Sequence, residues 1–350
     1  MEEQLAQLRH QTACAITLSV FGLTVRDVLQ SSRFAPQARD LSVAELWSGV
    51  GAVKKAAEQE GLNTVAYDKN KAQAQGPVAM GQGPRSQVFS RASEDILTEE
   101  GFHNALGITM RLKVGGLLWM APVCSSFLFL NLANTKRKRI SGYTGDSKYP
   151  AVAEGNMMAK IAAFLFTVAW ARLVEAVIEN PASSLIFKYA PVRNTLQTLT
   201  VYFAVCARCR FSEEAYGKRC KKPYKFAATG DWVRNLQFSC RCPGHRHATL
   251  STSIVKNGKR HITGILPALR RSAAYPFPLG QAIVDAWRCV PVRVPPADAS
   301  GSSVPGPRSA GAAESLRLPV KGSDCVNTKA PVSAAKRRDW MTPSASGAGK

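Results

Sequence analysis

Acidic residues are scarce in this sequence. Its 350 residues include 46 Lys and Arg but only 24 Asp and Glu, which gives a formal net charge of +22 at pH 7. Such an imbalance favours polyanionic partners, nucleic acid first among them, over acidic small molecules. The excess is uneven, because residues 201–271 hold 15 basic and 3 acidic residues, about half of it. We expect a basic surface in that stretch.

Cysteines, a basic leader and long apolar runs are also in short supply. Nine cysteines are few for a disulfide scaffold of this length. Glu2 and Glu3 stand where a secretory signal would carry basic residues. The apolar run 161–171 is far shorter than the roughly 20 residues of a membrane span. We expect a reduced, intracellular protein that makes no membrane contact, with this run as a buried helix.

The chain divides into three segments by pattern and composition. Residues 1–40 show apolar spacing typical of one helix, which we expect to pack on the main domain. From 41 to 290, apolar runs alternate with helical patterns, which predicts an α/β fold with a parallel sheet. Residues 291–350 are rich in Pro, Gly, Ser and Ala, and we expect them to be disordered. The cluster Lys336-Arg337-Arg338 in this tail favours a nuclear location.

A glycine-rich turn follows the first predicted strand of the main domain. Residues 43–51 indicate a buried strand that runs into this turn, and a helix is predicted over 52–60. Backbone amides in such a turn approach a cofactor closely. A second strand over 64–67 ends on Asp68, where a carboxylate can accept hydrogen bonds from a ribose diol. The alternative is a tight turn with a purely structural role.

Two further strands end on residues capable of chemistry. The strand 116–121 leads to Cys124, and the strand 176–178 leads to Glu179, Asn180 and Pro181. Open α/β sheets bind ligands at the carboxyl ends of their strands, so a thiol and a carboxyl group would face one crevice. Taken alone, Cys124 has an alternative reading as a small buried apolar side chain.

In this order, the Ser-Gly-x-Gly turn, the acidic strand end, the Pro-x-Cys strand end and Glu-Asn-Pro resemble the DNA cytosine-5 methyltransferases. The resemblance covers about residues 41–181, and 120–187 also resemble divergent methyltransferase-like proteins of protist genomes, often associated with mobile elements. It implies a Rossmann-like fold that uses S-adenosylmethionine. The chain departs from the family at Val123 and Ser125, where the family usually has Pro and Gln, and at Leu128, where it usually has Ser.

The resemblance assigns a role to each matched position. The residues implied for the cofactor, from its methionine part through the ribose to the adenine, are Glu45, Leu46, Ser48, Gly49, Gly51, Asp68, Asp95, Ile96 and Pro122. Cys124 would attack carbon 6 of cytosine while Glu179 holds and protonates ring nitrogen 3, which makes carbon 5 nucleophilic. Asn180 and Pro181 would shape the loop. Arg208 and Arg210 match two arginines of a family strand and would contact the target base or phosphate, or belong to a general basic face.

Two more clusters have readings that the sequence leaves open. Lys136, Arg137, Lys138 and Arg139 follow the Cys124 loop and would clamp a nucleic-acid backbone, the alternative being a solvated charge run. The potential zinc ligands are Cys206, Cys209, Cys220, Cys240, Cys242, His245 and His247. Because Cys240 and Cys242 lack the usual two-residue gap, we expect no metal, with zinc as the alternative.

These features predict a cytosine-5 methyltransferase-like protein that transfers a methyl group from S-adenosylmethionine to DNA. One alternative is a catalytically inactive, mobile-element-associated relative that only binds nucleic acid. Another is a tRNA cytosine methyltransferase, since RNA would present the same base. Patterns in the sequence do not identify protein partners.

Overall fold

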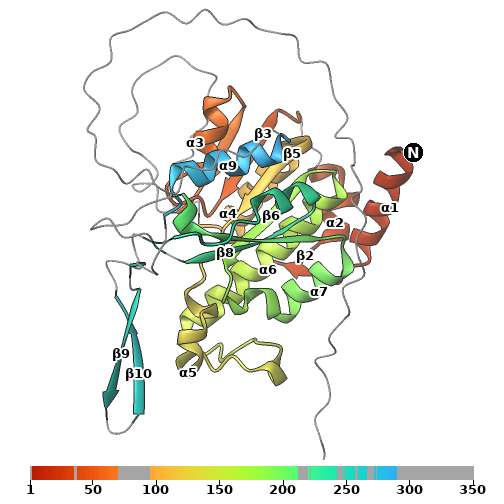
Figure 1. The fold of residues 1–350 in the computed structure, drawn as a ribbon. Helices are drawn as coiled ribbons and strands as arrows, with labels where there is room; N and C mark the ends of the chain where they lie inside the picture. Colours follow the sequence, from red (N-terminus) through yellow and green to blue (C-terminus); the bar gives the residue numbers. More distant parts are fainter. Residues whose placement is uncertain are drawn as a thin grey trace, which may run out of the picture. The chain divides into compact units, whose positions relative to one another are not determined.

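A six-stranded sheet forms the centre of the main domain (Figure 1). The structure is a computed structural model, and it describes residues 2–34, 38–69, 95–211, 220, 222–242, 247–248, 250–256, 259–265, 272 and 274–289. The strand order is β4-β3-β5-β6-β8-β7. The strands span β3 (Leu41–Leu46), β4 (Thr64–Tyr67), β5 (Leu112–Met120), β6 (Glu175–Pro181), β7 (Tyr202–Ala207) and β8 (Pro223–Ala228). Strands β4, β3, β5 and β6 are parallel to one another, and β8 runs antiparallel to its neighbours β6 and β7.

Alternate residues of the central strands enter two separate cores. Leu118 and Ile178 join one apolar cluster, whereas Leu117 and Val177 join the other. Successive side chains of a strand point to opposite faces, so both faces of this sheet are buried. The continuous apolar strands recognised in the sequence follow from this burial.

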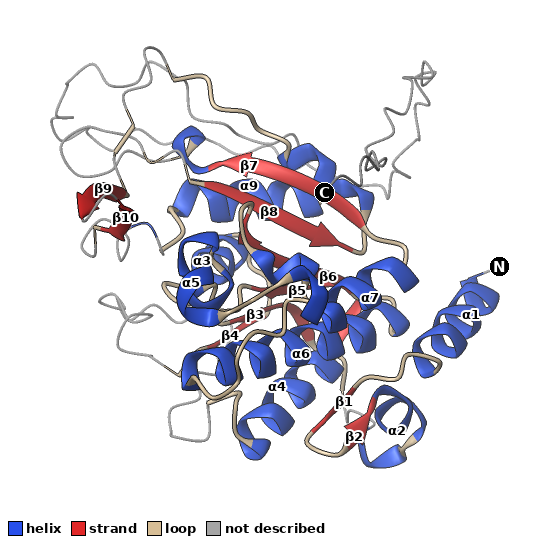
Figure 2. Ribbon diagram, turned by 90° about the horizontal axis from the view of Figure 1, so that it is seen from below, coloured by secondary structure: helices blue, strands red, loops and turns tan. Residues whose placement is uncertain are grey.

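Helices cover both faces of the sheet (Figure 2). One layer contains α3 (Ala52–Gln59) and α9 (Phe277–Trp287). The other contains α4 (Glu99–Arg111), α6 (Pro150–Ala171), α7 (Ala190–Thr198) and the N-terminal α1 (Glu2–Cys14) and α2 (Val25–Gln30). The smaller elements are α5 (Leu132–Thr135) and two antiparallel hairpins, β1 (Ser19–Val20) with β2 (Leu23–Thr24) and β9 (Ser251–Lys256) with β10 (Lys259–Gly264). This mixed α/β architecture with a mostly parallel sheet, compatible with a Rossmann-like fold, confirms the predicted class.

Helix α6 contains the apolar run that the sequence singled out. By length and composition alone α6 could cross a membrane, but 67% of its apolar window is buried inside the protein. Phe164 and Phe166, for instance, are fully buried in the core beneath the sheet. The burial explains the apolar composition of α6, as the sequence predicted.

The N-terminal segment differs from the prediction of a single helix over 1–40. Helix α1 ends at Cys14, and the chain then forms the β1–β2 hairpin before α2. Phe21 and Gly22 make the turn with φ of 48° and 79°, the conformation of a two-residue hairpin turn that glycine favours. The prediction that this segment packs on the main domain is confirmed, because Val20, Val25 and Val28 are buried in its core. The predicted tail, 291–350, lies outside the described residues.

Candidate functional site

The turn after β3 forms one wall of a cavity at the carboxyl ends of the strands. Trp47, Gly49 and Gly51 have φ of 53°, 53° and 66°, so two glycines occupy positions that disfavour side chains. The backbone N–H of Gly49 donates to Oδ2 of Asp68 at 2.9 Å, which joins this turn to the end of β4. Ser48 and Gly49 line the cavity, whereas Gly51 caps α3 beside it.

Glu45 lies below this turn and has a different contact from the one implied by the resemblance. Its side chain is fully buried, and its Oε2 accepts the backbone N–H of Lys54 at 2.8 Å, in the first turn of α3. Burial raises the pKa of Glu45 to about 7, although backbone amides of α3 oppose the shift. The carboxyl group therefore accepts a hydrogen bond from the backbone at the N-terminus of α3, a helix that has no side-chain cap. Glu45 and the buried Leu46 do not line the cavity.

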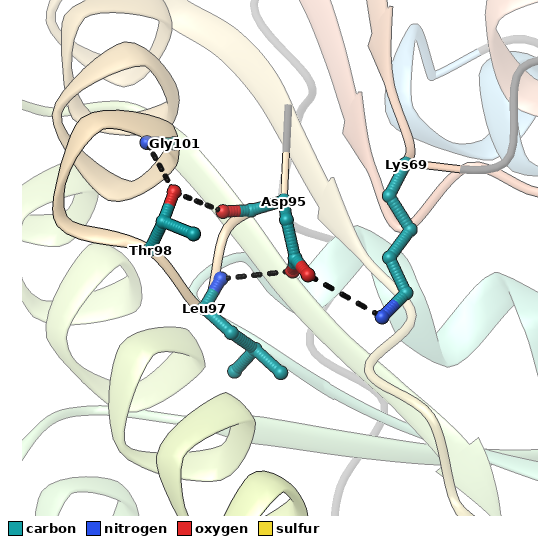
Figure 3. A network of polar contacts seen from close by, with 5 residues as sticks. All are labelled: Lys69, Asp95, Leu97, Thr98 and Gly101. Atoms are coloured by element: carbon teal, nitrogen blue, oxygen red, sulfur yellow. Dashed lines mark hydrogen bonds and ion pairs between the residues drawn. The ribbon is translucent and has the colours of Figure 1, made fainter. Parts of the chain in front are cut away.

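Asp95 and Ile96 line a neighbouring pocket of about 220 Å³ that shares Trp47, Asp68 and Val123 with the first. The backbone carbonyl of Asp95 accepts the hydroxyl of Thr98, and its Oδ1 accepts the N–H of Leu97 at 3.1 Å (Figure 3). Its Oδ2 lies 3.5 Å from Nζ of Lys69, which follows Asp68 in the chain. The predicted ribose and adenine residues thus meet around one pocket.

Cys124 follows β5 and immediately precedes a short 3-10 helix over Ser125–Phe127. Cys124 lines the same cavity as Ser48 and Gly49, together with Pro122 and Asp68, and this cavity has a volume of about 250 Å³. Burial raises the pKa of the Cys124 thiol, Lys222 opposes this shift, and the carboxyl group of Glu179 adds to it. In the free protein the thiol form therefore predominates at neutral pH.

Glu179 and Asn180 reach the same cavity from the end of β6. The hydroxyl of Tyr275 donates to Oε2 of Glu179, and the side-chain amide of Asn180 donates to the carbonyl of Pro122 at 2.8 Å. Burial raises the pKa of Glu179 to about 7, with Tyr275 and Lys222 acting in the opposite direction. A protonated form of this carboxyl group is consequently accessible near neutral pH. Asn180 ties the strand end of Glu179 to the loop that carries Cys124.

Lys222, Tyr224 and Tyr275 also line this cavity, and the sequence did not assign a role to any of them. Lys222 and Tyr224 lie at the start of β8, which runs antiparallel and therefore begins where the parallel strands end. Tyr275 precedes α9 and stacks edge-on against Tyr224, with ring centroids 5.3 Å apart.

The two arginines implied by the resemblance do not line the cavity. Arg208 is buried, and its guanidinium donates to the hydroxyl of Tyr224 at 2.8 Å and to the carbonyl of Ala274. These contacts hold the segment that carries Tyr275. Arg208 is thus a support for the cavity wall in this conformation, and Arg210 is half-buried beside it.

The predicted clamp at 136–139 requires one correction. Lys136, Lys138 and Arg139 are exposed, as a phosphate-binding cluster needs. Arg137 is buried, and its guanidinium donates to backbone carbonyls of Ser126, Tyr143 and Thr144. With its donors used inside the protein, Arg137 is removed from the clamp.

No family model matches the chain, and no curated protein matches it.

Proposed function

We propose that this protein is an S-adenosylmethionine-dependent methyltransferase that acts on carbon 5 of cytosine in DNA. One observation carries the proposal: a thiol, Cys124, and a buried carboxyl group, Glu179, line the same cavity at the strand ends. This cavity adjoins the pocket at Asp68 and Asp95.

The residues around the two pockets fit S-adenosylmethionine by their chemistry. Asp68 at the end of β4 offers carboxylate oxygens for a ribose diol, and the apolar Ile96 and Met158 offer a surface for an aromatic base. Among the described residues, Ser48 Oγ, Glu179 Oε1 and Asn180 Oδ1 are buried side-chain atoms without a hydrogen-bond partner. Such atoms normally have one, so a bound ligand would complete their hydrogen bonding.

The proposed mechanism begins at the sulfur of Cys124. Its thiolate adds to carbon 6 of a cytosine held in the cavity, and the protonated carboxyl of Glu179 gives ring nitrogen 3 its proton. S-adenosylmethionine supplies an electrophilic methyl group. Carbon 5, made nucleophilic by these two steps, takes that methyl group, which leaves S-adenosylhomocysteine as the other product. Water then accepts the proton at carbon 5, the sulfur–carbon bond breaks to release the thiolate, and ring nitrogen 3 returns its proton to the Glu179 carboxylate.

The raised pKa of the Cys124 thiol favours a second candidate function. Because the pKa of this thiol is raised, the free protein holds little thiolate at neutral pH. A catalytically inactive relative that binds nucleic acid would retain the fold and the excess of basic residues without needing that thiolate. Activity assays on DNA and RNA separate the two candidates and also test the tRNA alternative.

The proposed nuclear location rests on the basic cluster at 336–338, which lies outside the described residues.

The first prediction is that replacing Asp68 weakens binding of S-adenosylmethionine. Each hydrogen bond to a charged group contributes about 1.5–3 kcal/mol, so Asp68→Ala should weaken binding about tenfold or more. Titration calorimetry on the full chain measures this affinity. Glu58→Ala, which alters a carboxylate in α3 outside both pockets, is the control and should bind normally. Equal affinities for both variants and the wild type would remove Asp68 from the site.

The second prediction concerns the three exposed residues Lys136, Lys138 and Arg139. Each neutralised phosphate adds about 0.9 to the log–log salt slope on duplex DNA, so replacing all three with alanine should lower the slope by up to about 2.7. Fluorescence anisotropy across a salt series measures it. Alanine at the exposed Arg26, Arg33 and Lys113, which lie on α2, just after it and at the start of β5, is the matched control. A slope that falls equally in the control would rule out a localised clamp.

A further inference from the structure

Three cysteines and a histidine come together beyond the edge strand β7. The cluster consists of Cys209, Cys240, Cys242 and His247, whose ligand atoms all lie within 4.8 Å of one another. Cys209 is buried, and the other three are half-buried. Of the other potential ligands in the sequence, Cys206 and Cys220 are outside this cluster, and His245 lies outside the described residues.

We propose that Cys209, Cys240, Cys242 and His247 bind one structural zinc ion. Three thiolates and an imidazole are a usual closed, tetrahedral ligand set for zinc. With zinc–sulfur bonds of about 2.3 Å, tetrahedral geometry places sulfur atoms about 3.8 Å apart and leaves a slightly shorter sulfur–nitrogen edge. Sγ of Cys240 and Nε2 of His247 are 3.3 Å apart. The other separations, none above 4.8 Å, exceed a tetrahedral edge by at most about 1 Å.

Backbone contacts bring the two ligand-bearing segments together independently of the cysteines. The N–H of Ala207, at the end of β7, donates to the carbonyl of Phe238 at 2.8 Å. A side-chain contact adds to this, because Gln237 accepts the N–H of Val205 at 2.7 Å. Cys209 lies two residues beyond one side of this junction and Cys240 two residues beyond the other. These two contacts therefore bring the segments of Cys209 and Cys240 together without the help of a metal.

This arrangement answers the objection raised by the sequence. Cys240-Arg241-Cys242 lacks the two-residue gap of common zinc motifs, which favoured a protein without metal. In the structure, however, Cys240 and Cys242 supply only two of the four ligands. Cys209, in the 3-10 helix Arg208–Arg210, and His247 supply the other two. A disulfide would use only two of the three thiols and leave the histidine without a role.

The zinc site would support the cavity wall from outside. Arg208 adjoins Cys209 in the chain and donates to the hydroxyl of Tyr224, which lines the cavity. A metal that links Cys209 to Cys240, Cys242 and His247 would fix this arginine and, through it, the position of Tyr224. The proposal does not depend on the chemistry at Cys124.

Elemental analysis of the full chain, purified without chelator, tests the proposal. The wild type should contain one zinc per chain, and Cys240→Ser and His247→Ala should each retain less than about a tenth of that content. Cys289→Ser is the matched control, because this exposed cysteine is outside the cluster, and it should retain the full content. Zinc content that is equal in all variants would overturn the assignment.

Cobalt binding to the wild type keeps the test valid if the ligand variants fail to fold. Replacement of zinc by cobalt should give sulfur-to-cobalt charge-transfer bands and the strong visible bands of a tetrahedral site. A cysteine-directed mercurial should release the metal. A chromogenic chelator then measures how many metal ions are released per chain. The proposal fails if wild type loaded with zinc retains none after desalting, or if peptide mapping of metal-free protein finds two of these cysteines joined by a disulfide.

Discussion

Replacing Cys124 with serine should abolish covalent capture of DNA that contains 5-fluorocytosine. In the proposed reaction, Cys124 bonds to carbon 6, and release of the product requires loss of the proton at carbon 5. Fluorine at that position cannot leave as a proton, so the sulfur–carbon bond persists and the complex survives denaturing electrophoresis. The expected loss of adduct rate in Cys124→Ser is at least about 1000-fold, because a serine hydroxyl is scarcely ionised at neutral pH.

The carboxyl group of Glu179 has a separate signature in the same assay. Glu179→Gln keeps the shape of the side chain but cannot deliver a proton to ring nitrogen 3, so adduct formation should slow about 100- to 10,000-fold. Burial raises the pKa of Glu179 to about 7, which provides the protonated form in the wild type. Cys289→Ser, which alters a thiol that does not line the cavity, should react at the wild-type rate.

Three outcomes of this experiment lead to different conclusions. Adduct with DNA that depends on Cys124 supports the methyltransferase, and adduct with tRNA alone moves the substrate to RNA. Absence of adduct and of methyl transfer with both nucleic acids, in protein that still binds them, favours the catalytically inactive relative. Because the pKa of Cys124 is raised in the free protein, activity requires that the thiolate be stabilised in the complex with nucleic acid. The positive charge of the nearby Lys222 acts in that direction.

Local patterns in the sequence predicted the parts of the site that lie on consecutive strands. The strand over 64–67, the turn before α3 and the ends of β5 and β6 were found because each combines an apolar run with a polar terminus. Parallel strands then place those termini on one edge of the sheet. Cys124 and Glu179 therefore line one cavity, as the sequence indicated, and Asp68 lines it with them.

The remaining wall of the site depends on contacts between distant segments. Lys222 reaches the cavity because β8 is antiparallel, and Tyr275 reaches it from the segment before α9. Neither fact follows from local hydrophobic periodicity. The single-helix prediction for 1–40 failed for a local reason, because Phe21 and Gly22 adopt turn conformations that interrupt otherwise helical spacing.

Burial of charged side chains was the other feature that the sequence did not reveal. Glu45 and Arg137 occur in a cofactor-like motif and a basic run, two contexts that both suggest exposure to a ligand. In the structure each is buried and bonded to backbone groups, Glu45 to the start of α3 and Arg137 to the loop after Cys124. The distinction requires the positions of donors and acceptors in three dimensions.

Replacing Arg137 with alanine should therefore destabilise the fold, in contrast to its exposed neighbours. The guanidinium donates to Ser126 O at 2.8 Å, Tyr143 O at 2.6 Å, Thr144 O at 3.0 Å and Asn156 Oδ1 at 2.8 Å, and its carbon lies 3.7 Å from the centroid of the Phe127 ring. Burial lowers the pKa of Arg137 to about 10, which still leaves it charged at neutral pH. Truncation leaves several buried acceptors unpaired, at about 1–3 kcal/mol each.

Urea unfolding of the full chain measures this effect. We expect Arg137→Ala to lower the free energy of unfolding by about 3–5 kcal/mol with an unchanged denaturant slope, whereas Lys138→Ala should change it by less than about 0.5 kcal/mol. Arg137→Lys should recover only part of the loss, because an ammonium group cannot reproduce the planar array of donors. Normal stability of Arg137→Ala, combined with a lower salt slope for DNA binding, would return Arg137 to the clamp. Loss of stability instead identifies it as the residue that fixes the loop beside Cys124, since Ser126 supplies two of its acceptors.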